Sequence, residues 1–216
     1  MAYPTVSKPY GFKPVNLIGG LPYAGSTRLM KIPTNYATGI FYGDVVKLAS
    51  SGEINKDVGQ TTATPVGIFV GCTFTSPITK QPVYSQNWVA ATAASDAYAY
   101  VVDDPNVLFK AVLVSGNTED GNGLTPAYLG RTMVGSNVEI VQNTGDSSSG
   151  DSRIAIYSAA GGTTTASLPV RIIDVVPDTA NSSGNYVEFI CKWNMPYQDA
   201  GGSLLGGHQY LNPTGV

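Results

Sequence analysis

The single histidine, His208, is the side chain with which a serine or cysteine nucleophile would have to pair, because imidazole is their usual general base. It lies in a glycine-rich stretch, Gly206-Gly207-His208-Gln209, and a mobile tail is a poor support for preorganised catalysis. The G-x-S-x-G elbow of serine hydrolases does not occur in the sequence. The sequence therefore predicts a protein that is not an enzyme and has no catalytic residue.

Two acidic sites could bind a cation or act as an acid/base pair. Asp103 and Asp104 are adjacent and precede Pro105, but neighbouring residues of a strand point to opposite faces, so a turn before the proline is the favoured interpretation. The stretch 120–123 resembles part of a calcium loop without the spaced oxygen ligands and the terminal glutamate. No metal site and no cofactor are predicted.

The two cysteines and the paired glycines suggest no chemistry either. Cys72 and Cys191 each lie within an apolar run, and neither belongs to a C-x-x-C or zinc-like spacing. Two buried free thiols are therefore predicted. The glycine pairs form neither G-x-G-x-x-G nor a P-loop, which argues against a phosphate-binding loop.

The composition favours a subunit of an assembly. Charged residues make up only 12% of the 216-residue chain, which holds 13 tyrosines, and protein interfaces are depleted in lysine and glutamate but enriched in tyrosine. Residues 1–43 carry four cations and no acid, so they contribute +4 and leave −7 for the rest of a chain of net charge −3. Such a basic segment could steer onto an acidic partner.

Other partners are not expected. Four cations spread over 43 residues are too dilute for a nucleic-acid footprint. The longest apolar runs are far below the roughly 20 residues that span a bilayer, and the first residues lack the apolar stretch of a secretory signal. We expect neither nucleic acid nor membrane as a partner.

The elements that must position these residues are strands. Alternating or apolar runs of five to nine residues are rich in valine, isoleucine, tyrosine and phenylalanine and predict strands at residues 40–48, 66–74, 97–102, 108–114, 138–142, 153–157, 170–176 and 186–193. A short helix beginning at Thr125-Pro126 and ending at Gly130 is the best helical candidate. The fold class is therefore all-β, or nearly so.

The two ends of the sequence differ in composition from its middle. Residues 1–25 are rich in proline and glycine yet hold many apolar side chains, and residues 196–216 are similar. We expect an N-terminal arm (1–25), a β domain (26–115), a second β region or a continuation of the first (116–195) and a glycine-rich C-terminal tail (196–216). Both ends could cover the chain's own core, or one could reach a neighbouring subunit; in the second case the contact residues would be Tyr3, Lys8, Tyr10, Phe12, Lys13 and Tyr23.

The tryptophans allow another function, stacking on a sugar as in carbohydrate-binding β-sandwich modules. Trp193 shares one face of its predicted strand with Phe189 and Cys191, which indicates a core residue. Trp88 follows a polar run and its role stays open.

A family resemblance narrows the expectation. Gly43-Asp44-Val45-Val46, followed by Pro65 to Gly71 with the sequence PVGIFVG, resembles a motif of the head decoration, or cement, proteins of tailed phages. The resemblance covers roughly residues 16–75 and implies a compact, strongly curved β-tulip or sandwich-like fold with extended arms. It also implies a homotrimer, made in the host cytoplasm, that binds the major capsid protein on the capsid exterior of the virion and stabilises the shell. Another virion component, such as a tail, fibre or major capsid protein, is the nearest alternative. On this view, removal of residues 1–25 would leave a folded protein that no longer binds capsids.

Overall fold

The computed structural model describes residues 6–114, 130–157, 165–179 and 186–213. These residues form strands and three short 3₁₀ turns, η1 (Arg131–Met133), η2 (Pro177–Thr179) and η3 (Gln209–Leu211), and contain no α-helix. The predicted all-β class is confirmed. The short helix expected at Thr125 falls outside the described residues.

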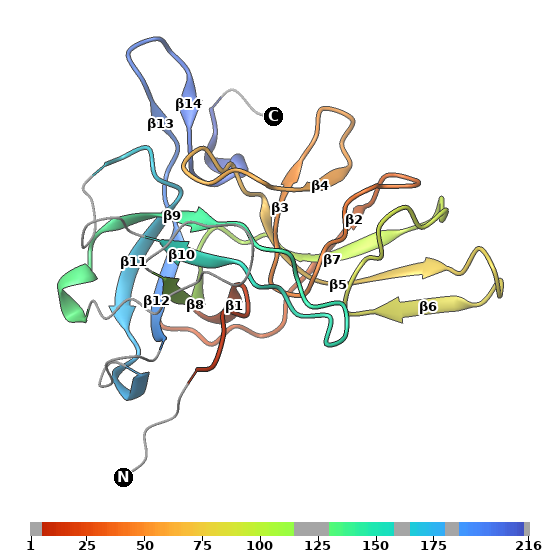
Figure 1. The fold of residues 1–216 in the computed structure, drawn as a ribbon. Helices are drawn as coiled ribbons and strands as arrows, with labels where there is room; N and C mark the ends of the chain where they lie inside the picture. Colours follow the sequence, from red (N-terminus) through yellow and green to blue (C-terminus); the bar gives the residue numbers. More distant parts are fainter. Residues whose placement is uncertain (1–5, 115–129, 158–164, 180–185, 214–216) are drawn as a thin grey trace.

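The larger sheet closes into a five-stranded barrel in the order β8-β10-β9-β11-β12 and back to β8 (Figure 1). Its strands are β8 (Val107–Val114), β10 (Ala155–Tyr157), β9 (Asn137–Val141), β11 (Val170–Val175) and β12 (Val187–Trp193). Only β8 and β10 pair in parallel. A sixth strand, β1 (Lys13–Leu17), pairs with the first half of β8 on the edge that β10 occupies further along, so the N-terminal segment is part of this sheet.

The second sheet lies beside the barrel and has the order β2-β7-β5-β3-β4, with β6 paired to the far half of β5 (Figure 1). Its strands are β2 (Arg28–Lys31), β7 (Tyr98–Val102), β5 (Gly67–Thr75), β3 (Val45–Leu48), β4 (Ile54–Lys56) and β6 (Pro82–Ser85). The β5–β6 hairpin projects away from the barrel. A small hairpin of β13 (Tyr197–Gln198) and β14 (Leu204–Leu205) follows β12.

The two main core clusters do not divide strictly by sheet, because the larger one extends from the barrel to Val45, Ile68 and Val102 of the second sheet. The barrel encloses a cluster that includes Phe109, Phe189 and Trp193, all at most 1% exposed. A smaller cluster around Trp88 lies against the second sheet, where the Trp88 indole nitrogen donates to the carbonyl of Tyr36 at 3.3 Å. The core role predicted for Trp193 is confirmed. Because neither tryptophan is accessible, the hypothesis that Trp88 stacks on a sugar is wrong.

A buried polar junction joins the two sheets at the Gly43-Asp44 corner. Gly43 has a φ of +94°, which favours glycine, and the Asp44 amide donates to the carbonyl of Phe41 at 2.9 Å. The fully buried Asp44 carboxylate lies 2.8 Å from the Lys56 ammonium and accepts a hydrogen bond of 2.5 Å from Ser152. This corner links β3 and β4 to the segment before β10.

At Gly67 the backbones of β5 and β7 approach closely, because a Cβ there would lie 2.2 Å from the carbonyl oxygen of Val102. Both cysteines are buried and free, as predicted. Burial raises the pKa of the Cys72 thiol to about 12. Strands β1 and β8, from the expected arm and first β domain, lie in the same sheet as β9 to β12.

Candidate interaction surfaces

Phe12 lies inside the barrel and not on an arm. Its ring is fully buried, with centroid distances of 5.2 Å to Trp193 and 6.3 Å to Phe109. Its amide donates to the carbonyl of Gly43. The prediction that Phe12 contacts a neighbouring subunit is therefore wrong. Although Phe12 belongs to a proline-rich segment, its side chain packs in the core of its own chain.

Tyr10 and Lys13 belong to a cluster on the outer surface of the barrel. Lys13 of β1 and Lys110 of β8 are directly paired, and their ammonium groups lie 4.7 Å and 5.7 Å from the centroid of the Tyr10 ring. Glu188 of β12 balances this charge, since its carboxylate lies 3.1 Å from the Lys110 ammonium and accepts a hydrogen bond from the Tyr10 hydroxyl. Burial and the bond to Glu188 raise the pKa of Tyr10. These two predicted contact residues are mostly engaged within the chain.

The other predicted contact residues are divided between internal and accessible positions. Lys8 is half exposed and lies 3.1 Å from Asp146, whose pKa is lowered by hydrogen bonds from Ser148, Lys8 and Arg153. Tyr23 is partly buried against the barrel core and its hydroxyl donates to the carbonyl of Ser26 at 2.8 Å. Tyr3 lies outside the described residues.

Removal of residues 1–25 would consequently delete β1 and Phe12 from the barrel. The expectation that the shortened protein stays folded does not agree with this packing. The prolines of residues 1–25 indicated an arm, but they do not exclude β1. This strand lies at the edge of its sheet, where proline is tolerated because one row of backbone amides is unpaired.

The described C-terminal residues are also packed on the chain. Gln209 forms two hydrogen bonds with the backbone of Leu48, accepting from its amide at 2.6 Å and donating to its carbonyl at 3.1 Å. His208 is fully buried, and its Nδ1 accepts from the Tyr210 amide at 3.2 Å. Burial lowers the pKa of His208 to about 4. The interpretation of this stretch as a mobile tail is therefore wrong for residues 206–212.

The most distinctive accessible surface lies on the second sheet, on the side whose other end packs against the barrel core through Ile68 and Val102. In the register of β2, β7, β5 and β6, Lys31 pairs with Tyr98, Tyr98 with Thr73 and Thr73 with Tyr84. One pair further along, Leu29 is opposite Tyr100. Paired residues share a face, and we call this side the tyrosine face; it comprises Leu29, Lys31, Thr73, Tyr84, Tyr98 and Tyr100.

The two sides of this sheet differ sharply. Met30, Ala99 and Cys72 lie on the side that packs against the Trp88 cluster and are at most 7% exposed. On the tyrosine face, Tyr84 is 76% exposed and Leu29 is 54% exposed. Lys31 lies 5.7 Å from the Tyr98 ring centroid and donates to the carbonyl of Ser95 at 2.7 Å, and its charge adds to the hydrogen bonds from Thr75 that lower the pKa of Asp96. The tyrosine face is thus aromatic, with one lysine, and largely accessible.

A depression of about 500 Å³ lies at one end of the tyrosine face, where β5 and β6 meet β1. Tyr84, Tyr100 and Tyr42 supply rings, and Gln86 and Asp151 supply polar groups joined by a 3.1 Å hydrogen bond. Gly71 has a φ of +143° at a shift in register between β5 and β7, which bends β5 there.

Part of the tyrosine face could have been predicted from the sequence. In the predicted strand 97–102, Tyr98 and Tyr100 alternate with Ala99 and Val101, so both tyrosines must share a face. Tyr84 lies on β6, an edge strand that begins at Pro82 and was not predicted. The pairing that aligns Tyr84 with Tyr98 depends on tertiary structure.

The acidic pair forms a turn, as predicted. Asp104 accepts from the amide of Asn106 at 2.8 Å, and Asp103 accepts from Arg28 at 2.6 Å and from the Tyr210 hydroxyl at 2.9 Å. Within residues 6–114, 130–157, 165–179 and 186–213, no three His, Cys, Asp or Glu side chains cluster in a way that could hold a metal. No helix in the same residues is long and apolar enough to cross a membrane.

Comparison with known proteins adds no family to this description, because no family model, no curated protein and no solved structure matches the chain. Functional conclusions consequently depend on the surfaces themselves, above all on the tyrosine face.

Proposed function

We propose that the chain is a structural subunit of a tailed-phage virion, specifically a head decoration protein that binds the outside of the capsid and is not an enzyme. Its function would be binding alone. It would bridge neighbouring major capsid subunits and associate with copies of itself, as a trimer according to the family resemblance. A bridge of this kind stabilises the shell, because the contacts across it must break before the subunits can separate.

The tyrosine face is the observation that carries the proposal. Tyrosine supplies a large contact area at low cost in side-chain entropy, and it is enriched where protein surfaces become buried. Three tyrosines, a leucine and a lysine share the accessible part of one side of the second sheet. A surface of that composition fits a protein partner with acidic groups at its edge.

The size of the molecule is compatible with two such contacts. A standard interface buries about 800 Å² on each partner, so two would cover about a sixth of the 10009 Å² that the isolated chain exposes. The tyrosine face could contact one partner while the barrel stays free for another.

Co-sedimentation with empty shells tests this function. The purified protein is mixed with empty capsids of the phage that encodes it, and the bound fraction is measured after pelleting. We expect the wild type to pellet with the shells and the double variant Tyr84→Ser/Tyr98→Ser to stay in the supernatant. Val58→Ser is the matched control, because Val58 is 63% exposed and follows β4, at the opposite edge of the same sheet. Equal retention of all three proteins, or of none, would contradict the proposal.

The depression beside Tyr84 and Tyr100 favours one alternative, a glycan-binding module. Tyrosine rings with nearby amide and carboxylate groups can stack on and hydrogen-bond to a sugar, and the volume of about 500 Å³ lies in the usual range for ligand sites. Calorimetric titration with neutral oligosaccharides separates the two functions: heat of binding that Tyr84→Ser abolishes, together with no retention on shells, would favour the glycan.

A further inference from the structure

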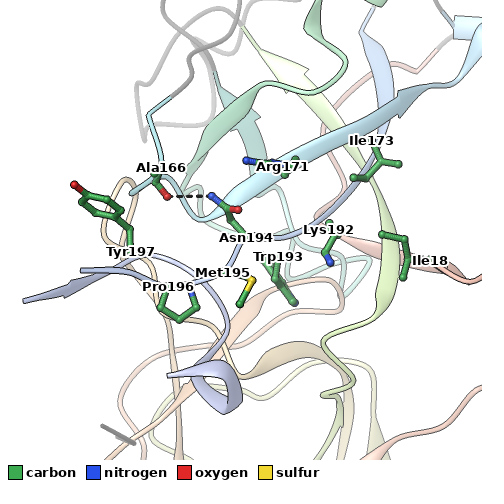
Figure 2. Close-up of a pocket in the computed structure, with 10 residues that line it drawn as sticks. All are labelled: Ile18, Ala166, Arg171, Ile173, Lys192, Trp193, Asn194, Met195, Pro196 and Tyr197. Atoms are coloured by element: carbon green, nitrogen blue, oxygen red, sulfur yellow. Dashed lines mark hydrogen bonds between the residues drawn. The ribbon is translucent and has the colours of Figure 1, made fainter. Parts of the chain in front are cut away.

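A second accessible site lies on the outer surface of the barrel, along β11 and β12. Arg171 and Lys192 are directly paired across these antiparallel strands. They line a groove of about 510 Å³ whose other walls are mainly apolar, with Ile18, Ile173, Met195 and Tyr197 among them. Figure 2 shows the Arg171 and Lys192 side chains on adjacent strands, with Met195 on the segment that leads into β13 and Tyr197 at the first position of β13.

The pairing of two cations in this groove is unfavourable for the isolated chain. Like charges directly opposite each other in a sheet destabilise it. Neither Arg171 nor Lys192 has a carboxylate partner in the described part of the chain, and none of the lining residues is acidic. Within the described residues, two positive charges therefore lie beside apolar side chains without a compensating carboxylate.

The Lys13–Lys110 pair provides an internal comparison. It has the same geometry across β1 and β8, but Glu188 lies 3.1 Å from Lys110 and the Tyr10 ring lies under both ammonium groups. Among the described residues, one like-charge pair is thus compensated internally, while the other has no anion beside it. That difference indicates that the anion for Arg171 and Lys192 comes from another molecule.

Arg171 is held in place for such a contact. Its Nε donates to Oδ1 of Asn137 at 2.9 Å, and the Asn137 side chain is buried and donates in turn to the carbonyl of Thr165 at 3.0 Å. This orients the guanidinium, and its two terminal nitrogens have no hydrogen bond to a residue that the structure describes. A guanidinium in this state is suited to a carboxylate, which can bind both nitrogens at once.

We propose that the groove along β11 and β12 binds an extended segment of a partner protein in which acidic side chains alternate with apolar ones. The carboxylates would lie between Arg171 and Lys192, and the apolar side chains would cover Ile18, Met195 and Tyr197. The proposal goes beyond the function given above and uses different residues, so it does not depend on the tyrosine face.

The exposure of the walls favours a protein segment over a small ligand. Sites for small molecules enclose 70–90% of the ligand surface. Here Met195 is 66% exposed, Ile18 is 49% exposed and Leu21 in the same turn as Ile18 is 65% exposed. The apolar surface consequently continues past the groove and would be covered only by a chain that lies across it.

Fluorescence anisotropy with defined peptides tests the proposal. The probe is a fluorescein-labelled nonapeptide of alternating valine and aspartate, and the comparison peptide has asparagine in place of each aspartate. We expect the acidic peptide to bind the wild type about tenfold more tightly than the amide peptide, since hydrogen bonds to charged groups are the stronger kind. Lys192→Glu should weaken binding of the acidic peptide by at least about tenfold, while Lys192→Met should have a smaller effect in the same direction.

Two further readouts separate binding from a structural role. Lys80→Glu is the matched control: it makes the same change in net charge in the turn between β5 and β6, where Lys80 has no ion pair with a described residue, and it should leave peptide binding within twofold of the wild type. Lys192→Glu should also raise the thermal midpoint of unfolding, because the new carboxylate would face Arg171.

Four results would overturn the proposal. They are equal binding of the acidic and amide peptides, no binding of either peptide to the wild type, unchanged binding after Lys192→Glu, and self-association of the wild type that Lys192→Glu abolishes, since the occupant would then be a second copy of the chain. None of these measurements uses capsids. The groove proposal can therefore be overturned while the virion function holds, and the virion function can be overturned while the groove proposal holds.

Discussion

The ring of Phe12 lies 5.2 Å from that of Trp193, measured between centroids, in the interior of the barrel. This contact joins the N-terminal segment to the end of β12 and makes it part of the core. Phe12→Ala should therefore lower the free energy of unfolding by about 3–5 kcal/mol, the usual cost of a phenylalanine deletion in a core. Denaturation in urea checks the value. Tyr84→Ala is the exposed control and should change the free energy by less than about 0.5 kcal/mol. A loss below about 1 kcal/mol for Phe12→Ala would favour the detachable arm that the sequence first indicated.

Truncation tests the same conclusion at the level of the strand. Removal of residues 1–5 should leave the thermal midpoint within a few degrees of the full chain, because Phe12 and β1 remain. Removal of residues 1–25 should abolish cooperative unfolding, since β8 loses its pairing along Lys13–Leu17 and the barrel loses a buried ring. Circular dichroism and calorimetry distinguish the two. A cooperative transition in the longer truncation would contradict this account of β1.

Asp44 should be the most sensitive polar residue of the chain. Asp44→Asn leaves the Lys56 ammonium, 8% exposed, without its carboxylate, and breaking a buried ion pair typically costs 3–5 kcal/mol. The double variant Asp44→Asn/Lys56→Met removes the stranded charge and should recover part of that loss. Urea denaturation of the two variants measures the recovery. If the double variant were no more stable than Asp44→Asn, burial of the charge would not be the cause.

His208 should make stability depend on pH between about 6.5 and 4. Burial lowers its pKa to about 4 in the folded chain, whereas the unfolded chain takes up the proton near the ordinary value of about 6.5. Below pH 6.5 the unfolded state thus binds a proton that the folded state does not, and stability falls. The loss between pH 7.5 and 4.5 should be about 2–3 kcal/mol.

The comparison with His208→Gln isolates this contribution. Buried carboxyl groups such as Asp57, whose pKa is raised by burial, titrate alike in both proteins and cancel in the difference. The free energy of unfolding of His208→Gln should fall less than that of the wild type over the same range. Identical pH profiles would show that the imidazole is not kept neutral by the fold.

Period and composition were sufficient to predict the central strands. Regular alternation in residues 170–176 and 186–193 corresponds closely to β11 and β12, because both have one face in the barrel core. The predicted strand 40–48 was too long, since β3 begins only at Val45, after the Gly43 corner. Short edge strands such as β2 and β6 were not predicted. Each of these strands has four residues and pairs with one neighbouring strand, so the alternation of apolar and polar residues is too short to predict it. In β6, Pro82 also argued against a strand.

The candidate surfaces were less accessible to sequence reasoning. Phe12 and Tyr10 were correctly recognised as residues that must be covered, but the sequence could not show that the cover is the chain's own barrel. Arg171 and Lys192 are 21 positions apart and unremarkable alone; only the register of β11 and β12 places them opposite each other. Contacts set by pairing between distant strands were thus the part that sequence could not supply.

Cryo-electron microscopy of empty shells incubated with the purified protein tests the central claim most directly. The account predicts additional density on the capsid exterior into which the barrel and the second sheet fit, with Tyr84 and Tyr98 buried against a capsid subunit or a second copy of the chain. Shells without added density, or bound protein whose tyrosine face points into solvent, would contradict it.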